Sequence, residues 1–379
     1  MKSVDVAIVG AGPAGLACAA SVRALGLRVS VLEKADAVGS AWRRHYDRLH
    51  LHTDKGHSGL PGLSMPRSYP RYPSRAQVVE YLESYATHFE IQPVFGADVQ
   101  AIRRDGPGSN SNWRIEAGAH TVSAPVVVVA TGWTDFPHMP SWPLQAEYQG
   151  TIQHSRDYRN PGPYIGKRVL VVGFGNSGGE IALDLADKGI DVSLSVRGPV
   201  QILPRELLGM PILTWAIAQR RLPAAFADFI NAPAIRLAVG SITKLGLQRA
   251  AKGPRRMVEE NGRVPLIDVG TLAGIRDGSI KINVGIERFT PRGVIFLDGQ
   301  SKDFDAVILA TGFRPDARTL LPDAKNAYDD NGKPHVTGGP TSEPGLFFCG
   351  FVASATGQLR EISIEAERIA AHALRYVRA

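Results

Sequence analysis

Two glycine-rich stretches have the spacing of a phosphate-binding turn. Residues 10–15 are GAGPAG and residues 173–178 are GFGNSG, with glycines at the first, third and sixth positions. The first glycine permits a tight turn, the second lets the backbone approach a pyrophosphate, and the third lets a helix pack on a strand. N–H groups at the helix start bind the anion. The candidate contacts are Gly10, Gly12, Pro13, Ala14 and Gly15 in the first turn, and Gly173, Gly175, Asn176, Ser177 and Gly178 in the second.

The two stretches differ at the position that would contact the adenosine ribose. Glu33 stands 18 residues after Gly15, and its carboxylate would accept hydrogen bonds from ribose hydroxyls. The equivalent residue after Gly178 is Val196, which cannot do so, and Arg197 follows it. An arginine beside a missing carboxylate accommodates a 2′-phosphate. The first site therefore predicts FAD or NAD and the second NADPH. FAD is favoured in the first, because a redox relay needs an acceptor that passes electrons onward.

Strand and helix patterns surround both stretches, as this motif requires. Residues 4–9 form an apolar strand, residues 16–25 an alanine-rich helix, and residues 28–32 a second strand. The same order recurs in residues 167–172, 179–188 and 191–196. We therefore predict an α/β fold with two Rossmann-like dinucleotide-binding domains.

Two apolar strands that end in Ala-Thr-Gly suggest how the domains are connected. They occupy residues 126–132 and 306–312, each downstream of one glycine turn. They predict an NADPH domain inserted into the FAD domain. We expect the FAD domain in residues 1–150, the NADPH domain in 151–300 with a helical insertion at about 203–263, and the FAD return segment in 301–379. Further candidate cofactor contacts are Thr131, Gly132, Thr311, Gly312 and Gly350.

Composition excludes several other classes of protein. The 379 residues are 44% apolar and 21% charged, with a net charge of +7, as in an ordinary globular protein. No long run of basic residues indicates nucleic-acid binding. Cys18 and Cys349 form neither a CxxC redox pair nor a metal site. The uncharged stretch at residues 207–219 is too short to span a bilayer. Asp5 interrupts the N-terminal apolar run, so we expect a cytoplasmic protein and no signal peptide.

A short motif before the second turn resembles the class B flavin-containing monooxygenases. Tyr148, Gly150, His154 and Tyr158 are similar to that family's signature F-x-G-x-x-x-H-x-x-x-F/Y. Other stretches resemble the YUCCA-type plant enzymes, which oxidise indole-3-pyruvate. These stretches are residues 46–52, 72–74, 81–85, 203–209, 265–270 and 312–315.

The resemblance implies roles for particular residues. Residues 10–15, Glu33 and its neighbour Lys34 would contact FAD, together with Trp42, which matches the tryptophan of a GGxW segment. The second turn and Arg197 would contact NADPH. Many members place an asparagine beside the flavin, where this chain has His-Thr-Asp at residues 52–54. Thr53 and Asp54 are our candidates for lining that site.

The resemblance also implies the chemistry. NADPH reduces FAD, O₂ forms a C4a-(hydro)peroxyflavin, and one oxygen atom reaches a small-molecule substrate, with an aromatic 2-oxo acid such as indole-3-pyruvate as the leading expectation. The insertion, with Trp215, Phe226 and Phe229, would be either a packed subdomain or the pocket wall, and Arg220-Arg221 would meet either a carboxylate or solvent. Weak membrane-surface contact by an apolar basic helix is a further interpretation, which rests on composition alone. S- or N-oxygenation, a flavin NADPH oxidase or reductase releasing hydrogen peroxide, and a redox-sensing binding protein remain alternatives. The oligomeric state, with a homodimer as one candidate, stays open.

Overall fold

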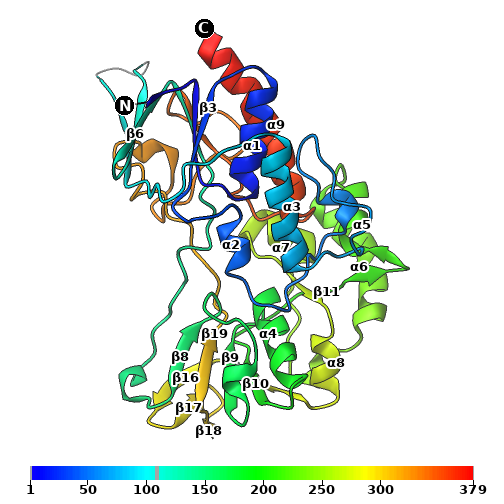
Figure 1. Ribbon diagram of the computed structural model, residues 1–379. Coiled ribbons are helices and arrows are strands. Elements are labelled where there is room, and N and C mark those ends of the chain that lie inside the picture. Colours follow the sequence, from blue (N-terminus) through cyan, green and yellow to red (C-terminus); the bar gives the residue numbers. More distant parts are fainter. Residues whose placement is uncertain (1, 107–110, 379) are drawn as a thin grey trace.

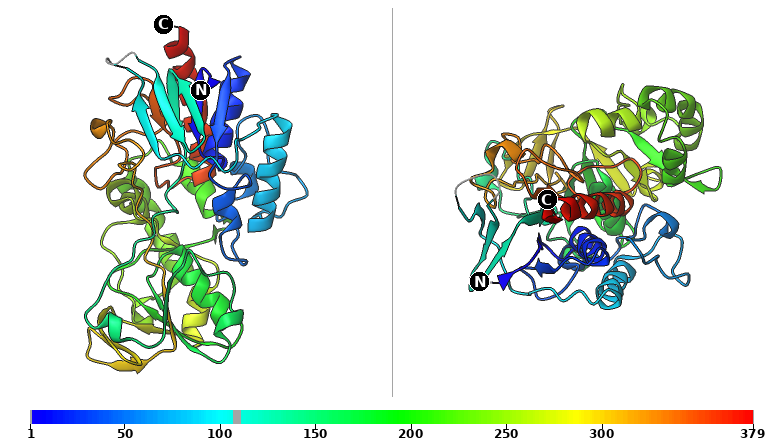
Figure 2. Two further views of the ribbon diagram at one scale, coloured as in Figure 1. Left: turned by 60° about the vertical axis from the view of Figure 1, so that its left-hand side comes forward. Right: turned by 90° about the horizontal axis from the view of Figure 1, so that it is seen from above.

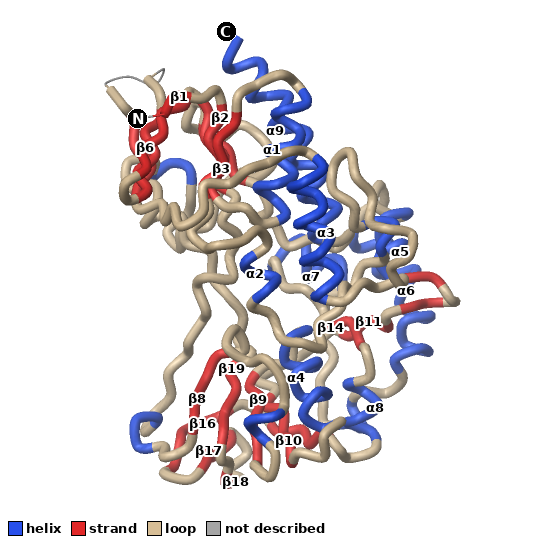
Figure 3. The backbone as a smooth tube through the Cα atoms, viewed as in Figure 1, coloured by secondary structure: helices blue, strands red, loops and turns tan. Residues whose placement is uncertain are grey.

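The computed structural model describes residues 2–106 and 111–378 of the chain. Figure 1 shows two lobes, with both termini in the upper lobe and the second glycine turn in the lower one. Figure 3 shows that long loop segments connect the two lobes. The helices are α1 (Pro13–Ala24), α2 (Ser40–Arg43), α3 (Arg75–His88), α4 (Asn176–Ala186), α5 (Ile212–Ala218), α6 (Ala224–Val239), α7 (Pro254–Asn261), α8 (Thr271–Arg276) and α9 (Gln358–Arg378). Short 3₁₀ turns lie at Lys55–His57, Gln145–Glu147, Gly162–Tyr164, Thr243–Leu245 and Lys325–Ala327.

The upper lobe is built on a parallel sheet of four strands in the order β20-β7-β2-β3. The strands are β2 (Val6–Val9), β3 (Val29–Leu32), β7 (Val126–Val129) and β20 (Leu346–Phe348). In β7, Val126 and Val128 pack into the core that contains α1 and α9. Val127 and Val129 pack into a second core, beneath an antiparallel layer. Burial on both faces explains the unbroken apolar run of this strand.

The antiparallel layer covers the other face of this sheet. It comprises the antiparallel strands β4 (Ala101–Arg104), β5 (Trp113–Ala117) and β6 (His120–Ala124), with β1 (Lys2–Ser3) paired in parallel with β6, in the order β1-β6-β5-β4. On the helical face, α1 packs along α9, and Figure 2 shows these two helices side by side in both views. The upper lobe therefore has three layers.

The lower lobe contains a second parallel sheet, in the order β15-β10-β9-β19-β8. The strands are β8 (Thr151–His154), β9 (Arg168–Val172), β10 (Asp191–Ser195), β15 (Ile280–Asn283) and β19 (Ala306–Leu309). Helices α4 and α8 cover one face of it, and a small antiparallel sheet covers the other. That small sheet is β16 (Ile286–Thr290), β17 (Gly293–Phe296) and β18 (Ser301–Asp303). Both lobes thus repeat one architecture, as the two glycine motifs predicted.

The pairing of β19 corrects one expected boundary. The sequence placed the return to the FAD domain at residue 301, but Ala306–Leu309 hydrogen-bond in parallel register with both β8 and β9. The strand that re-enters the upper sheet is β20, which pairs with β7. We therefore propose that the return segment begins after β19. The two Ala-Thr-Gly strands look alike in sequence, because each is an interior strand that pairs with the strand leading into its own glycine turn.

Residues 202–268 form the helical insertion, between β10 and β15 of the lower sheet. Its strands are β11 (Ile202–Pro204), which pairs in parallel with β14 (Leu266–Asp268), and the hairpin β12 (Glu206–Leu207) with β13 (Met210–Pro211). Helices α5, α6 and α7 lie between these strands. Within residues 2–106 and 111–378, none of the helices combines the length and apolar content that crossing a bilayer would need.

Candidate active site between the two lobes

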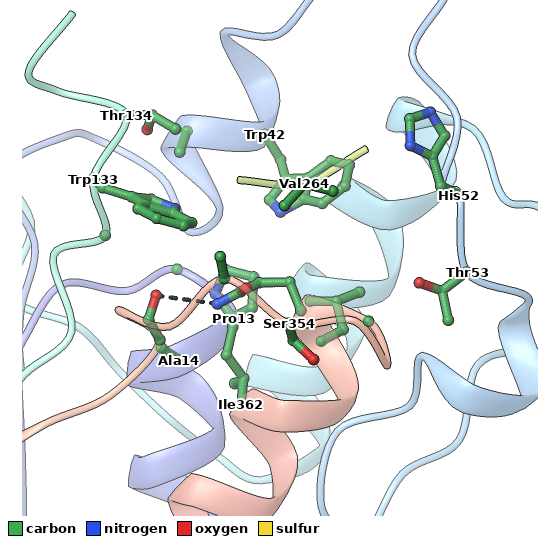
Figure 4. Close-up of a pocket in the computed structure, with 18 of the residues that line it drawn as sticks. Pro13, Ala14, Trp42, His52, Thr53, Trp133, Thr134, Val264, Ser354 and Ile362 are labelled. Carbon is green, nitrogen blue, oxygen red and sulfur yellow. Dashed lines mark hydrogen bonds between the residues drawn. The ribbon is translucent and has the colours of Figure 1, made fainter. Parts of the chain in front are cut away.

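A cavity of about 680 Å³ lies where the upper lobe, the second turn and the insertion meet. Its lining includes residues of the first turn, the loop 49–53, the segment 130–136 and the insertion. Figure 4 shows part of this lining: Pro13 and Ala14 of α1, Ile362 of α9, Trp42, Trp133, His52 and Thr53. Mostly apolar walls with a few polar groups are typical of a cofactor or substrate site.

The first glycine turn has room for a phosphate on one side only. A side-chain carbon on Gly10 would lie 2.6 Å from the Ala130 carbonyl oxygen, and one on Gly15 would lie 1.8 Å from that of Gly10. Both glycines are therefore required by close backbone packing. A carbon on Gly12 would meet no protein atom within 4 Å. Gly12 caps α1 without any side-chain hydrogen bond, so N–H groups after Pro13 in the first turn of that helix can bind an anion. The turn fits the pyrophosphate of a dinucleotide.

The second glycine turn repeats this geometry. Carbons on Gly173 and Gly178 would lie 2.4 Å from the Ala310 oxygen and 2.1 Å from the Gly173 oxygen, whereas Gly175 again faces open space. Gly175 also caps α4 without a side-chain bond. The turn therefore fits a second dinucleotide.

The side chains of the second turn have structural partners that the sequence did not reveal. The side-chain oxygen of Asn176 accepts a hydrogen bond of 2.7 Å from the Ile267 N–H, which ties the turn to β14. Asn176 also lines the cavity. Ser177 forms a hydrogen bond with the Tyr46 hydroxyl. The second turn is therefore held against both the insertion, through Ile267, and the segment of the upper lobe that contains Tyr46.

Glu33 is buried at the end of β3, beside the first turn. Its carboxylate accepts hydrogen bonds from the Ala11 N–H at 2.7 Å, the Ala35 N–H at 3.0 Å and the Ser40 hydroxyl at 3.3 Å. Glu33 also lines the cavity. The carboxylate thus holds the turn in shape and remains available to a ribose.

Lys34 and Arg44 line the cavity next to Glu33, and both bind Asp135. The ion-pair distances are 2.6 Å for Lys34 and 2.9 Å for Arg44, and Arg156 lies 3.6 Å from the same carboxylate. Because Asp135 follows β7 and Arg156 follows β8, this group ties together the segments that link the lobes. Lys34 is therefore one member of an ionic cluster at the domain junction.

Arg197 lies exposed just after β10, near the second turn. No salt bridge to Arg197 is present among the residues that the structure describes. His138 is close enough that burial, Arg314 and Arg197 together lower its pKa, and Arg314 lies 3.3 Å from the His138 ring. The two cations near His138, Arg197 and Arg314, fit the 2′-phosphate of NADPH.

His154 of the family signature bonds the end of β8 to the segment that follows β19. Its Nδ1 accepts the Arg156 N–H at 3.1 Å, so its Nε2 carries the proton and donates to the Gly312 carbonyl at 3.0 Å. Burial lowers the pKa of His154, which keeps the ring neutral. Position 150 requires glycine, because a side-chain carbon there would lie 2.3 Å from the Tyr148 hydroxyl. The signature residues therefore hold β8 against neighbouring segments of the lower lobe.

A buried His-Glu-Tyr group beside the cavity was missed by the sequence analysis. The Nε2 atom of His52, which lines the cavity, bonds with the Glu180 carboxylate. The other oxygen of Glu180 accepts from the Tyr46 hydroxyl at 3.3 Å. Burial and the neighbouring Glu180 raise the pKa of Tyr46 well above its usual value. Because Glu180 is on α4, this group joins the two nucleotide-binding halves. Glu180 is more than 120 residues away from both Tyr46 and His52, so no local motif could signal the group.

The structure separates the two residues proposed to lie beside the flavin. Thr53 is buried, lines the cavity and packs against Gly357, at the start of α9. Asp54 is outside the cavity lining: one of its oxygens accepts the Gly56 N–H at 2.9 Å and the other the Thr214 hydroxyl at 3.3 Å. Asp54 therefore fixes a turn and the insertion helix α5 in place.

The insertion supplies one wall of the cavity. Trp215 is held by a hydrogen bond of 3.1 Å from its indole N–H to the Leu207 carbonyl. The side-chain amides of Gln219 and Asn231 bond to each other, and Arg255 donates to the Gln219 carbonyl at 2.8 Å. All of these except Leu207 line the cavity. The insertion is thus a pocket wall, as one of the two interpretations of the sequence held.

Phe226 and Phe229 differ from Trp215, because both are exposed on the outer side of α6. Arg220 and Arg221 are exposed as well, which agrees with the solvated alternative. Helix α6 is apolar on both sides, so its sequence pattern could not show which side faces the cavity.

The remaining candidate residues divide between the cavity and its supports. Trp42, Thr131, Gly132 and Gly350 line the cavity, whereas Thr311 and Gly312 do not. The Thr311 hydroxyl donates to the His138 carbonyl at 2.5 Å. Cys18 and Cys349 are buried neighbours, and their hydrogen bond together with burial raises the pKa of the Cys349 thiol. The part of the chain that the structure describes contains no cluster of residues suited to a metal ion.

The fold and the two turns define a two-dinucleotide oxidoreductase. The sequence matches the family described as pyridine nucleotide-disulphide oxidoreductase over residues 7–205. A flavin-containing monooxygenase from Stenotrophomonas maltophilia has a similar structure, with a TM-score of 0.76 and 25% identity over 99% of each chain.

Sequence relatives narrow the assignment further. Indole-3-pyruvate monooxygenase YUCCA1 of Oryza sativa subsp. japonica is 40% identical over 328 residues, covering 86% of this chain and 80% of that protein. The probable indole-3-pyruvate monooxygenase YUCCA1 of Arabidopsis thaliana is 37% identical over 352 residues, covering 91% of this chain and 84% of its own length. The chain therefore belongs to the class B flavin-containing monooxygenases, among the YUCCA-type flavoproteins. FAD and NADPH are its cofactors, and it is a flavin-dependent monooxygenase.

Proposed function

We propose that this enzyme oxygenates an aromatic 2-oxo acid, with indole-3-pyruvate as the leading substrate. The observation that carries the proposal is the single cavity shared by the first turn and the Trp215 wall. The names of the plant relatives, which cover most of this chain, support the same substrate class. The reaction consumes the acid, O₂, NADPH and a proton, and gives indole-3-acetate, CO₂, NADP⁺ and water.

We assign FAD to the first turn and NADPH to the second. Glu33 and Trp42 would contact FAD, and Arg197 with its neighbour Arg314 would hold the 2′-phosphate of NADPH. Bound FAD supplies the hydride acceptor and the activation of O₂ that side chains cannot provide. The protein contributes position and exclusion of water.

Within the cavity, the insertion would hold the substrate. Trp215 is fixed by its indole hydrogen bond and offers an aromatic surface. Arg255, on the same wall, would place a cation near a substrate carboxylate, while its guanidinium is held by Glu259 at 2.7 Å and by the Gln219 carbonyl at 2.8 Å. On the opposite side, Thr53 offers a hydroxyl, and His52 is held in orientation by Glu180. We propose that His52 and Thr53 donate hydrogen bonds to reacting oxygen atoms, and that Asp54 positions the wall through Thr214.

The cofactors and the buried free cysteines also support a location in the cytoplasm. Cys18 and Cys349 are reduced neighbours, as is usual in a reducing compartment.

Feeding indole-3-pyruvate and NADPH under ¹⁸O₂ tests the reaction. We expect indole-3-acetate with one labelled oxygen, formed in step with NADPH loss. Hydrogen peroxide alone from the keto acid would indicate an oxidase, and clean sulfoxide from a thioether would indicate S-oxygenation. Both outcomes would overturn the substrate proposal. Trp215→Ala should raise KM for indole-3-pyruvate more than KM for a small thioether.

A further inference from the structure

Helix α6 carries an apolar stripe on its solvent side. The α6 stripe consists of Phe226, Phe229, Ile230, Pro233 and Leu237. These positions are spaced three or four residues apart, so they share one side of the helix. Phe229 is 76% exposed and Leu237 is 87% exposed. Figures 1 and 2 show α6 at the outer edge of the molecule.

The opposite side of the same helix lines the active-site cavity. Ala227, Asn231 and Ile235 belong to that lining. Helix α6 therefore forms a single-helix wall, with the cavity on one side and solvent on the other. Contact at the stripe would bring a partner within one helix diameter of the cavity.

The charge of the protein is concentrated around this helix. Residues 203–263 contain ten lysines and arginines against four acidic residues, a net +6 out of the +7 of the whole chain. Arg221, Arg236 and Lys244 are exposed near the two ends of α6. Among the described residues, these three have no salt bridge. The acid on α6, Asp228, accepts the backbone N–H groups of Arg255 and Arg256 and is not part of the stripe.

A second, shallow cavity of about 410 Å³ lies at the carboxyl end of the stripe, beside Leu237. Arg236, Arg249, Ser241 and Thr243 line it. Two guanidinium groups and two hydroxyls are the donors that bind a phosphate ester. This cavity is separate from the active site, and neither glycine turn contributes to it.

We propose that the α6 stripe and this shallow cavity dock the enzyme on an anionic lipid bilayer. The stripe would enter the headgroup layer while the cavity takes a lipid phosphate, as amphipathic helices with basic rims do. Charge argues against a second copy of the chain as the occupant, because a twofold pairing of α6 would bring Arg221 and Arg236 of the two copies together. An acidic nucleic acid would leave the phenylalanines of the stripe in water. The proposal does not depend on which substrate the enzyme oxidises.

Vesicle flotation tests the proposal with the full chain loaded with FAD. We expect binding to vesicles of phosphatidylcholine with 30% phosphatidylglycerol, no binding to phosphatidylcholine alone, and loss of binding in high salt. The double variant Phe229→Ser/Leu237→Ser should reduce vesicle partition at least tenfold. Ile165→Ser is the matched control, because Ile165 is 71% exposed elsewhere on the lower lobe. Its partition should match that of the native protein.

The charge arm uses Arg236→Gln/Arg249→Gln, with Arg375→Gln/Arg378→Gln at the end of α9 as control. The first pair should lower partition about tenfold or more, since each basic residue near an anionic surface contributes severalfold, and the control pair should have a smaller effect. Equal losses in both pairs would overturn the phosphate site. If the native protein does not bind anionic vesicles, the proposal is wrong. If it then also forms a concentration-dependent dimer that Phe229→Ser/Leu237→Ser abolishes, the stripe is a self-association surface.

Discussion

The two glycine turns have the same backbone geometry and different surroundings. In each turn, two glycines are required by carbonyl oxygens of the neighbouring backbone, while the middle glycine faces open space. After the first turn, the second strand ends in Glu33, a buried carboxylate with three hydrogen-bond donors. After the second turn, the equivalent strand leads to the exposed Arg197, which has no salt bridge within the described part of the chain.

This difference shows how one architecture is adapted to two nucleotides. The turn and the helix start recognise the pyrophosphate, which both dinucleotides share. Discrimination is left to one position at the end of the second strand, where a carboxylate suits a ribose hydroxyl and an arginine suits a phosphate. A buried acid can also hold the turn in shape. The exposed Arg197 would contribute through the ligand, as proposed for the 2′-phosphate.

The largest effect is expected from adding a methyl group to the tightly packed glycines. Gly15→Ala places a carbon 1.8 Å from the Gly10 oxygen, so α1 must move away from the turn. Because overpacking typically costs 1–3 kcal/mol and occasionally more, we expect a loss of roughly 3 kcal/mol in the free energy of unfolding. Denaturant titration measures this loss.

Gly12→Ala is the matched control, because its new carbon meets no protein atom. This variant should keep its stability without cofactor but bind FAD poorly. Equal stability losses in the two variants would contradict the division of roles within the turn. Gly178→Ala and Gly175→Ala should repeat the pattern for NADPH.

The second prediction concerns coenzyme choice. Arg197→Ala should raise KM for NADPH by roughly 10- to 100-fold, since a charged hydrogen bond contributes about 1.5–3 kcal/mol. KM for NADH should change little. Arg288→Ala is the control, because Arg288 pairs with Glu287 on β16 of the same lobe. A similar loss with both coenzymes would place the 2′-phosphate elsewhere and remove the contrast with Glu33.

The third prediction tests the double role of Glu33. Glu33→Gln keeps the shape of the side chain, but its NH₂ group then faces the backbone N–H of either Ala11 or Ala35, so one donor loses its acceptor. We expect the apoprotein to lose about 1–3 kcal/mol of stability, the usual cost of a buried donor left unsatisfied. FAD retention on a desalting column should fall as well. If stability stays unchanged while FAD is lost, the carboxylate serves only the ribose.

The smallest effect concerns the pH dependence of stability and depends on His45, which lines the cavity. Burial, followed by the charges of Arg159 and Arg44, lowers the pKa of His45 to about 4. The unfolded chain therefore takes up this proton first as the pH falls, so stability is full above pH 6.5 and declines toward pH 4. Between pH 7 and pH 5 we expect a loss of about 1–2 kcal/mol that His45→Gln removes. Urea titrations at both pH values measure it, and an unchanged pH dependence in the variant would assign the loss to other groups.

Much of the fold could be predicted because its signals are local. Glycine spacing, the apolar runs of β2 and β9, and Glu33 at a fixed distance from its turn all lie within single strand-turn-helix units. The strand at residues 306–309 shows the limit of this approach. Its sequence predicts a buried strand, but only its hydrogen bonds with β8 and β9 show which sheet contains it.

The sequence by itself predicted the two nucleotide sites and indicated the cofactors and the family, because each depends on motifs whose residues are close together in the chain. The tertiary structure decided how the cavity is assembled: the bond between His52 and Glu180, the supporting role of Asp54, and the outward side of α6. These features join residues that are distant in sequence, or choose between two apolar sides of one helix. Periodicity shows that a side chain packs, whereas only the arrangement of the surrounding elements determines what it packs against.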